Sequence, residues 1–151
     1  MTPEDRAQKC AESMWSRDSG SKWLGAQLEH VGPGTAVMSF TVAPNHLNGH
    51  GICHGGFIFA LADSAFAFAC NSRNRNAVAV HNTISYLSPG KLGEKLTARA
   101  REVNLKGRSG VYDVSVSACD GRELALFRGV SRIVAGSHFD EENIASTDTE
   151  A

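Results

Sequence analysis

The chain has 151 residues, of which 42% are hydrophobic and 21% are charged, a composition that predicts one globular domain with its own core. The formal net charge of −1 hides an uneven distribution, because the segment 137–151 contains five of the 16 acidic residues and no Lys or Arg. The basic excess in the rest of the chain is small and dispersed, which excludes the concentrated basic surface of a nucleic-acid-binding protein.

The apolar segments predict neither a signal peptide nor a membrane span. The first twelve residues contain no apolar run, and the segment 55–70 is shorter than the roughly 20 residues that a span needs. We therefore expect a soluble, cytoplasmic protein. The four cysteines, Cys10, Cys53, Cys70 and Cys119, form no C-x-x-C pair and no pattern typical of a small secreted disulfide framework. We expect them to be reduced thiols.

The N-terminal residues predict a helix followed by two strands. Thr2 has the features of an N-cap before a helix over Pro3–Arg17, and residues 1–20 form a predicted N-terminal helix and linker. A strand is expected over Leu24–His30, and a second one begins at Thr35 after a glycine-rich turn. In the second strand apolar side chains alternate with polar ones and share one face, at Ala36, Met38, Phe40 and Val42.

The segment Gly55–Cys70 predicts a long helix of unusual character. It is rich in Ala, too long for a typical strand, and apolar around its whole circumference except at Asp63 and Ser64. Because such a helix has no polar face to turn toward water, we expect the rest of the protein to surround it.

The C-terminal half predicts an antiparallel sheet, because four segments with period-two alternation are joined by short turns. They are Ala77–Leu87, Glu94–Leu105, Gly110–Cys119 and Glu123–Val134. Gly129, inside the last segment, indicates a bulge or a close backbone approach. The predicted fold class is α+β: one central helix wrapped by a curved antiparallel sheet of about six strands, after a short N-terminal helix. The domain is expected to span 1–136, and the acidic segment 137–151 to be a disordered tail.

Three kinds of chemistry compete for the segment 46–63. A metal site would use imidazole and thiolate donors, and the candidates are His46, His50, Cys53 and His54. Their spacing, however, matches no established zinc motif. A nucleophilic triad is disfavoured because G-x-S-x-G and S-x-x-K are absent, and Ser64 and Cys70 fall inside the buried helix.

The third possibility combines Gly55, Gly56 and Asp63. The first turn of a helix leaves backbone N–H groups without internal partners at its electropositive end. Glycines there would let a substrate carbonyl approach these donors, as an oxyanion hole requires. Asp63, among apolar neighbours, is a candidate base or nucleophile. In the structural alternative, Asp63 forms a hydrogen bond to the neighbouring backbone, and the two glycines only mark the beginning of the helix.

The distance between these groups predicts a dimer. Eight residues separate Gly55 from Asp63, a rise of roughly 12 Å along a helix, so one chain cannot place both groups at one carbonyl carbon. Two antiparallel copies of the helix could place Asp63 of one chain beside Gly55 of the other. We therefore expect an obligate homodimer with two shared sites.

The stretch NGHGICHGGFIFALAD, residues 48–63, resembles the signature of the hotdog-fold acyl-CoA thioesterases, in outline N-x-x-G-x-x-H-G-G-x-x-x-x-L-x-D. It is most similar to the phenylacetic-acid-degradation (PaaI) branch. The similarity continues in shorter motifs to residue 134 and so covers most of the chain. It implies a long central helix wrapped by an antiparallel sheet.

The resemblance implies a role for each residue of the motif. Asp63 would activate water or attack the thioester directly, and the N–H of Gly55 would polarise the thioester oxygen. Asn48 would orient the carbonyl or the water, and His54 would hold the sulfur side or merely fix the loop. Gly56 would keep the helix entrance open. Some relatives carry a Ser or Thr on the following strand, but the corresponding position here is Ala79, with His81 and Asn82 nearby.

The implied substrate is an acyl-CoA, with phenylacetyl-CoA or hydroxyphenylacetyl-CoA suggested by the PaaI branch. No separate cofactor and no metal is expected, since coenzyme A is part of the substrate. Basic side chains should bind its phosphates, and the candidates for substrate binding are Gly56, Pro89, Lys91, Lys106 and Arg108. The phenylalanines of the predicted helix could line an acyl pocket or could only form part of the core. They are Phe57, Phe59, Phe66 and Phe68.

Two alternative functions remain open. One is a hydratase or dehydratase of the same fold, although neither D-x4-H nor an H-F-P loop is present. The other is a non-catalytic acyl-CoA-binding protein, which would not need Asp63. The resemblance also implies that the dimers pair into a homotetramer, and neither nucleic acid nor a membrane is an expected partner.

Overall fold

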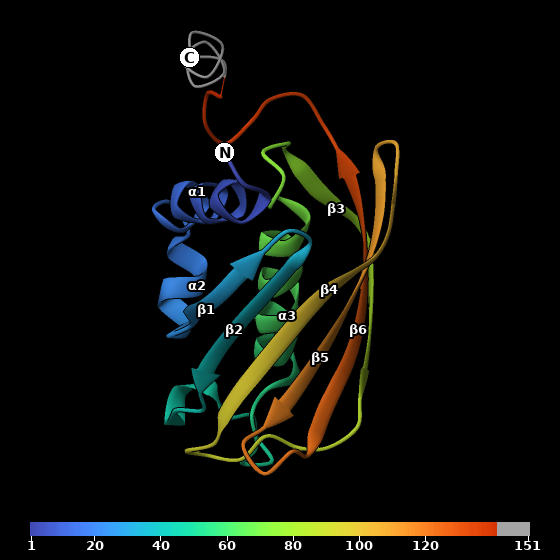
Figure 1. Ribbon diagram of the computed structural model, residues 1–151. Helices are drawn as coiled ribbons and strands as arrows, with labels where there is room; N and C mark the ends of the chain where they lie inside the picture. Colours follow the sequence, from blue (N-terminus) through green and yellow to red (C-terminus); the bar gives the residue numbers. More distant parts are fainter. Residues whose placement is uncertain (142–151) are drawn as a thin grey trace, which may run out of the picture.

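A computed structural model describes residues 1–141, and they form one sheet curved around one long helix (Figure 1). The helices are α1 (Pro3–Trp15), α2 (Ser19–Leu24) and α3 (Gly55–Cys70), with a short 3-10 turn at Pro44–His46. The strands are β1 (Gln27–Gly32), β2 (Thr35–Thr41), β3 (Ala77–Tyr86), β4 (Lys95–Lys106), β5 (Ser109–Ala118) and β6 (Glu123–Ile133). The predicted fold class is confirmed.

The sheet has the order β1-β2-β4-β5-β6-β3, and every neighbouring pair is antiparallel. The strand that follows α3 is therefore an edge strand, far from the other edge, β1. In Figure 1 the sheet curves around α3 from β1 to β3, and α1 and α2 lie beside β1.

The core lies between α3 and the concave face of the sheet. Leu61, Ala62 and Ala65 of α3 are fully buried against it. The sheet contributes alternate residues, as Tyr112, Val114 and Val116 of β5 show, with half-buried residues between them. The opposite face of α3 keeps partly exposed residues, among them Gly56, Ala60 and Ala67. The sheet thus covers only part of an apolar helix.

The close backbone approach that the sequence predicts is found at Gly129, next to the ring of Phe66. A Cβ atom at this position would lie 2.8 Å from two ring carbons of Phe66, nearer than real Cβ contacts come. Gly129 pairs with Asn82 on β3, so the missing side chain lets Phe66 pack directly on the β6 backbone.

The N-terminal region differs from the prediction. Asp18 caps the unpredicted helix α2, its carboxylate accepting from the N–H of Ser21 at 2.9 Å, and Gly25, at φ +82°, ends it. The first strand therefore begins at Gln27 rather than Leu24. A helix of six residues is too short to show a reliable period in the sequence.

The start of the predicted tail is described and packs near α1. The backbone N–H of His138 donates to the Asn74 side chain at 2.9 Å, and Arg6 forms an ion pair with Glu141 at 2.6 Å. The remainder of the predicted disordered tail, 142–151, lies outside the described residues. Within the described chain, no helix has the length and apolar character to cross a membrane.

We expect Gly129→Ala to lower the free energy of unfolding by about 1–3 kcal/mol, because the added methyl group overpacks the Phe66 contact. Chemical denaturation measures this change. Gly20→Ala is the matched control: its Cβ would meet only an Asp18 oxygen, at 3.8 Å, and it favours the helix α2. Unchanged stability of Gly129→Ala would contradict the contact.

Candidate active site

A tight turn leads the chain into α3. The N–H of His54 donates to the carbonyl of His46 at 2.8 Å, and the N–H of Asn48 to that of Ile52 at 2.8 Å. The side-chain oxygen of Asn48 accepts from the N–H groups of His50 and Ile52, at 2.9 and 3.3 Å. Asn48 therefore shapes the turn, and within the described chain its side-chain nitrogen has no hydrogen-bond partner.

The first turn of α3 leaves one particular backbone donor free. His54 is the N-cap, and its Nδ1 accepts from the N–H of Gly56 at 2.9 Å. The carbonyl of His54 accepts from the N–H of Phe57 at 3.0 Å. No described residue accepts from the N–H of Gly55. The electropositive helix end therefore presents the Gly55 N–H, whereas that of Gly56 is occupied by the cap.

Tyr86, at the end of β3, holds the same turn from the other side. Its hydroxyl donates to the carbonyl of Gly55 at 2.8 Å, and a Cβ atom on Gly55 would lie 3.1 Å from its ring. A Cβ atom on Gly56 would lie 3.0 Å from Nδ1 of His54. Both glycines thus sit where a side chain would crowd a group that holds the helix end.

Asp63 lies two turns further along α3 and is half-buried. Its Oδ1 accepts from the side-chain nitrogen of Asn82, on β3, at 2.9 Å. Burial raises the pKa of the Asp63 carboxyl above its ordinary value, and the hydrogen bond from Asn82 opposes this shift. From the sequence, Asn82 could be named only as a neighbour of Ala79, because nothing there indicates its contact with Asp63.

The other predicted site residues fall at both ends of the helix. The N–H of Cys53 donates to the carbonyl of Gly90 at 2.8 Å, which ties the Pro89–Lys91 segment to the beginning of α3. Lys106 and Arg108 lie instead in the β4–β5 turn, at the end of the sheet where α3 ends.

The four phenylalanines of α3 divide into two pairs. Phe66 and Phe68 are buried in the core, as the structural interpretation expects. Phe57 and Phe59 are partly exposed, and Phe57 packs on the rings of His46, His54 and Trp23.

The candidate metal donors do not converge within residues 1–141, which contain no group of three or more potential metal ligands. His46 is buried and accepts from the N–H of Ala43 through Nδ1, as His54 does from Gly56. Cys53 is also buried, and burial raises the pKa of its thiol to about 11.

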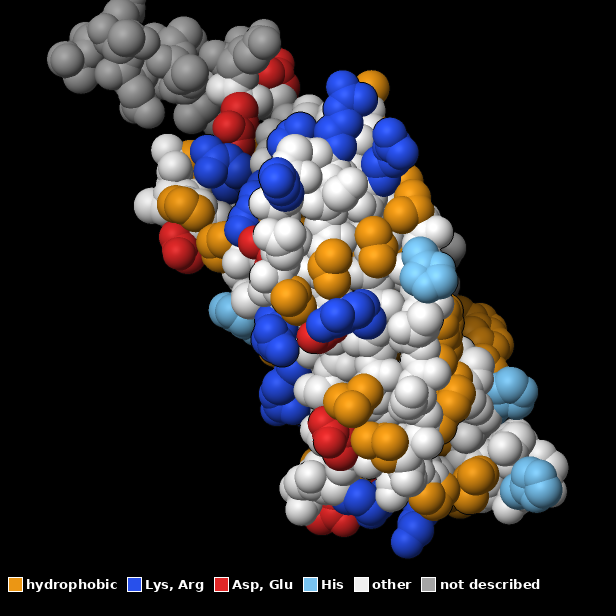
Figure 2. All heavy atoms as spheres, turned by 90° about the vertical axis from the view of Figure 1, so that its right-hand side faces the viewer, with side chains coloured by type: hydrophobic (Ala, Val, Ile, Leu, Met, Phe, Trp, Pro, Cys, Tyr) orange, Lys and Arg blue, Asp and Glu red, His pale blue; other side chains and the backbone are white. Residues whose placement is uncertain are grey.

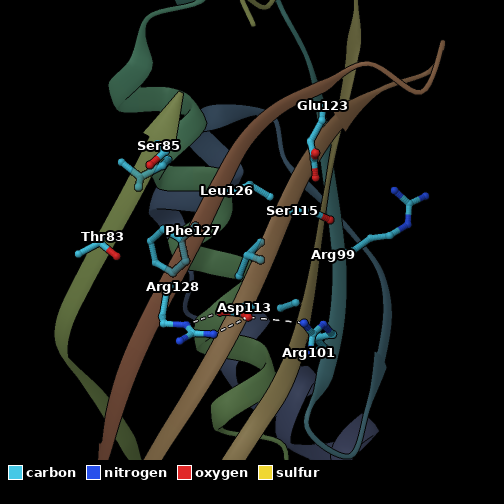
Figure 3. A pocket seen from close by; sticks show the side chains of 13 residues that line it. Thr83, Ser85, Arg99, Arg101, Asp113, Ser115, Glu123, Leu126, Phe127 and Arg128 are labelled. Atoms are coloured by element: carbon cyan, nitrogen blue, oxygen red, sulfur yellow. Dashed lines mark hydrogen bonds and ion pairs between the residues drawn. The ribbon is translucent and has the colours of Figure 1, made fainter. Parts of the chain in front are cut away.

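A hollow of about 660 Å³ lies on the outer face of the sheet, away from α3 (Figure 3). At its centre Asp113 accepts two hydrogen bonds from Arg128, at 2.6 and 2.8 Å, and lies 3.5 Å from Arg101. Arg128 lowers the pKa of Asp113, so the carboxylate is held in a structural ion pair. The sheet separates this hollow from Asp63.

Comparison with known proteins agrees with the fold. Residues 50–125 match the family described as the thioesterase superfamily. The chain is 42% identical over 132 residues to the acyl-coenzyme A thioesterase PaaI of Escherichia coli, covering 87% of this chain and 94% of that protein. The solved structure of E. coli PaaI, from the phenylacetic acid degradation operon, superposes with a TM-score of 0.89 at 40% identity, over 90% of this chain and 99% of that one.

Two more distant relatives differ in function. A hypothetical thioesterase of Streptococcus pneumoniae, solved with coenzyme A, has a TM-score of 0.71 at 26% identity, over 74% of this chain and 90% of that one. The transcription factor FapR of Bacillus cereus is 31% identical over 108 residues, which cover 71% of this chain and 53% of FapR.

Proposed function

The chain belongs to the thioesterase superfamily, and on that premise we propose that it hydrolyses acyl-CoA thioesters to a free acid and coenzyme A. The observation that carries the proposal is a free N–H at the electropositive end of α3 together with the hydrogen-bonded carboxylate of Asp63. The coenzyme A complex of the S. pneumoniae relative supports the substrate class.

The reaction needs one hydrogen-bond donor for the thioester oxygen and one carboxylate. The thioester oxygen would accept from the N–H of Gly55, which stabilises the charge that develops as the carbonyl carbon is attacked. Asp63 would take a proton from water, whose oxygen bonds to that carbon. The C–S bond then breaks, and the thiolate receives the proton. Direct attack by Asp63 would instead break the C–S bond, expel the thiolate and form an anhydride; water then hydrolyses the anhydride and supplies the proton that the thiolate takes up, so both routes use the same residues.

The site requires two chains, because Gly55 and Asp63 are separated by roughly 12 Å along α3. Gly55 contacts Tyr86 and Asp63 contacts Asn82, so both groups are anchored to β3, four residues apart. A twofold axis between these anchors would bring Tyr86 of one chain opposite the partner's Asn82. Gly55 would then lie beside the partner's Asp63.

The exposed surface of β3 supports this dimer. Within residues 1–141 this edge strand pairs with β6 alone, and it exposes large apolar side chains, including Val78 at 47% and Val80 at 56%. An edge of this kind is a template for pairing with another strand. The neighbouring face of α3 carries Gly56, Ala60 and Ala67, whose small side chains permit a second helix to approach closely.

In the shared site the turn before α3 has two free polar groups. The side-chain nitrogen of Asn48 is available to orient the thioester or the water, since its oxygen is committed to the turn. The imidazole of His54 accepts through Nδ1, which leaves Nε2 to donate toward the sulfur side.

Basic residues at the far end of the sheet are suited to the phosphates of coenzyme A. Arg75 and Arg108 line a hollow of about 350 Å³ with the segment 133–136, flanked by Lys106 and Arg132. None of these four cations has an ion pair within the described chain, and basic side chains gather at this end in Figure 2.

The distance along β3 from the reacting carboxylate to this basic end suits the substrate. Asn82, beside Asp63, and Ala77, beside the hollow, are five residues apart, roughly 17 Å along a strand. The pantetheine arm separates the thioester from the diphosphate by a length of this order. In the antiparallel dimer, Pro89 and Lys91 of the other chain lie toward the same end.

The acyl group that we propose is phenylacetyl or hydroxyphenylacetyl, supported by the E. coli relative from the phenylacetic acid degradation operon. A non-catalytic acyl-CoA-binding role is the second candidate, since the relative FapR is a transcription factor. Pairing of dimers into a homotetramer and a cytoplasmic location remain predictions.

We expect Asp63→Ala to lower kcat for thiol release from phenylacetyl-CoA by about 10²–10⁴-fold, because the reaction loses its base or nucleophile. A panel of acyl-CoAs and a thiol-reactive dye measure the rate, and calorimetry with free coenzyme A shows that binding is kept. Asp5→Ala, on the exposed first turn of α1, is the control. Equal thiol release by both variants would reject the role of Asp63, and none by the wild type would favour the binding role.

We expect mixed dimers to recover activity from two inactive variants. After subunit exchange, Asp63→Ala and Gly55→Val would together give roughly a quarter of wild-type turnover, because half of the dimers are hybrids with one intact site each. Native mass spectrometry follows the exchange, and each variant incubated alone is the control. Confirmed exchange without recovery, or a monomer at assay concentration, would contradict the shared site.

We expect the double variant Arg75→Ala with Arg108→Ala to raise KM for acyl-CoA about tenfold or more and leave kcat unchanged, because phosphate contacts are lost. The corresponding N-acetylcysteamine thioester has no phosphates, so its kcat/KM should be unaffected. Arg99→Ala with Arg101→Ala, on the outer face, is the matched control. A similar fall in kcat/KM for both substrates would place the phosphate site elsewhere.

A further inference from the structure

Asn82 is the side chain that donates a hydrogen bond to the Asp63 carboxylate within the described chain, and it lies outside the sequence motif of residues 48–63. Its Nδ2 donates to Oδ1 of Asp63 at 2.9 Å. We propose that Asn82 is the positioning residue for Asp63: it binds one carboxylate oxygen and leaves the other to face the substrate. This inference rests on the proposed thioester hydrolysis.

A β-bulge turns Asn82 toward the helix. Ala79 pairs with Ser131 of β6, but His81 pairs with Val130, so Val80 is an extra residue in β3. If the same residues formed a regular strand without a bulge, strict alternation from the inward-facing Ala79 would point Asn82 to the outer face. Bulges often redirect a side chain beside an active site, and here the bulge brings Asn82 to Asp63.

The partner strand makes room for this contact. Asn82 pairs with Gly129, which has no side chain. The ring of Phe66 packs against the Gly129 backbone. The Asn82 amide therefore occupies a layer bounded by an aromatic ring and by α3. The Asp63 carboxylate is held in one orientation, because among the described residues Asn82 alone donates a hydrogen bond to it.

The other end of the amide has an unfavourable environment. Oδ1 of Asn82 is sealed from solvent and has no hydrogen-bond partner within the described chain. A buried acceptor without a partner loses its hydrogen bond to water and receives none in return. A leucine of similar shape would avoid this loss, so stability alone does not explain an asparagine here. The bond that it makes to Asp63 does.

Asn82 also affects the charge state of Asp63. Burial favours the neutral acid, whereas donation from Asn82 favours the ionised form, which is the form that takes a proton or attacks. The nearby Cys70 thiol, whose pKa burial raises to about 12, stays neutral and supplies no competing charge. Removing the donor must therefore raise the pKa of Asp63.

The test compares Asn82→Leu and Asn82→Ser with the wild type, and uses Thr83→Val as the control on the outer face of the same strand. For Asn82→Leu we expect a melting temperature equal to or above that of the wild type. Its kcat should fall about 100-fold with KM changed less than twofold, because the carboxylate is misplaced. The acid limb of its kcat–pH profile should move to higher pH.

Asn82→Ser retains a short donor and should give smaller changes of the same sign. Carbon-13 NMR titration of Asp63 in Asn82→Leu measures the pKa increase without any assay of activity. Unchanged kcat and acid limb, or an unchanged Asp63 titration, in Asn82→Leu would overturn the proposal. If the wild type released no thiol, the proposed function would fail instead, while the titration would still decide whether Asn82 controls Asp63.

Discussion

The structure depends on one constraint: α3 is apolar on nearly every side and must be covered on nearly every side. The curved sheet covers the side with Leu61, Ala62 and Ala65, and α1, α2 and β1 lie along a second side. The remaining side carries small residues and the half-buried Asp63. A second copy of the same helix would meet this remaining requirement, which connects the burial of apolar surface to the assembly of the site.

The strand β3 connects the scaffold to the chemistry. It is an edge strand, it contains the bulge at Val80, and its inward side chains contact α3 at both proposed catalytic positions, through Tyr86 at Gly55 and Asn82 at Asp63. Without the bulge, the alternation that continues from Ala79 would turn both side chains outward. The bulge therefore determines which face of the sheet Tyr86 and Asn82 point to, and so whether they can contact Gly55 and Asp63 of α3.

Periodicity predicted the parts of the fold that rest on burial. The uniform apolarity of Gly55–Cys70 predicted a surrounded helix, and alternation located the later strands to within one or two residues. Lys106 and Arg108 were predicted as ligands, but only the strand order places them far from the beginning of α3. Asn82 could not be assigned from the sequence, because β3 exposes apolar residues such as Val78 and Val80, so its pattern of apolar and polar residues does not reveal the bulge. The short helix α2 was missed because its evidence is two end residues, Asp18 and Gly25, rather than a period.

The carboxylate and the amide beside it both work against the stability of the isolated chain. Burial disfavours the ionised Asp63, and Asn82 leaves its own oxygen without a partner in the described structure. By contrast, the Asp113–Arg128 pair on the outer face is joined by two hydrogen bonds, one to each carboxylate oxygen, and the sheet separates it from the helix. A paired carboxylate is suited to structure, because its charge is already neutralised. A carboxylate held by a single neutral donor keeps an oxygen available, and that difference is the reason for proposing the reaction on the α3 side of the sheet rather than in the outer hollow.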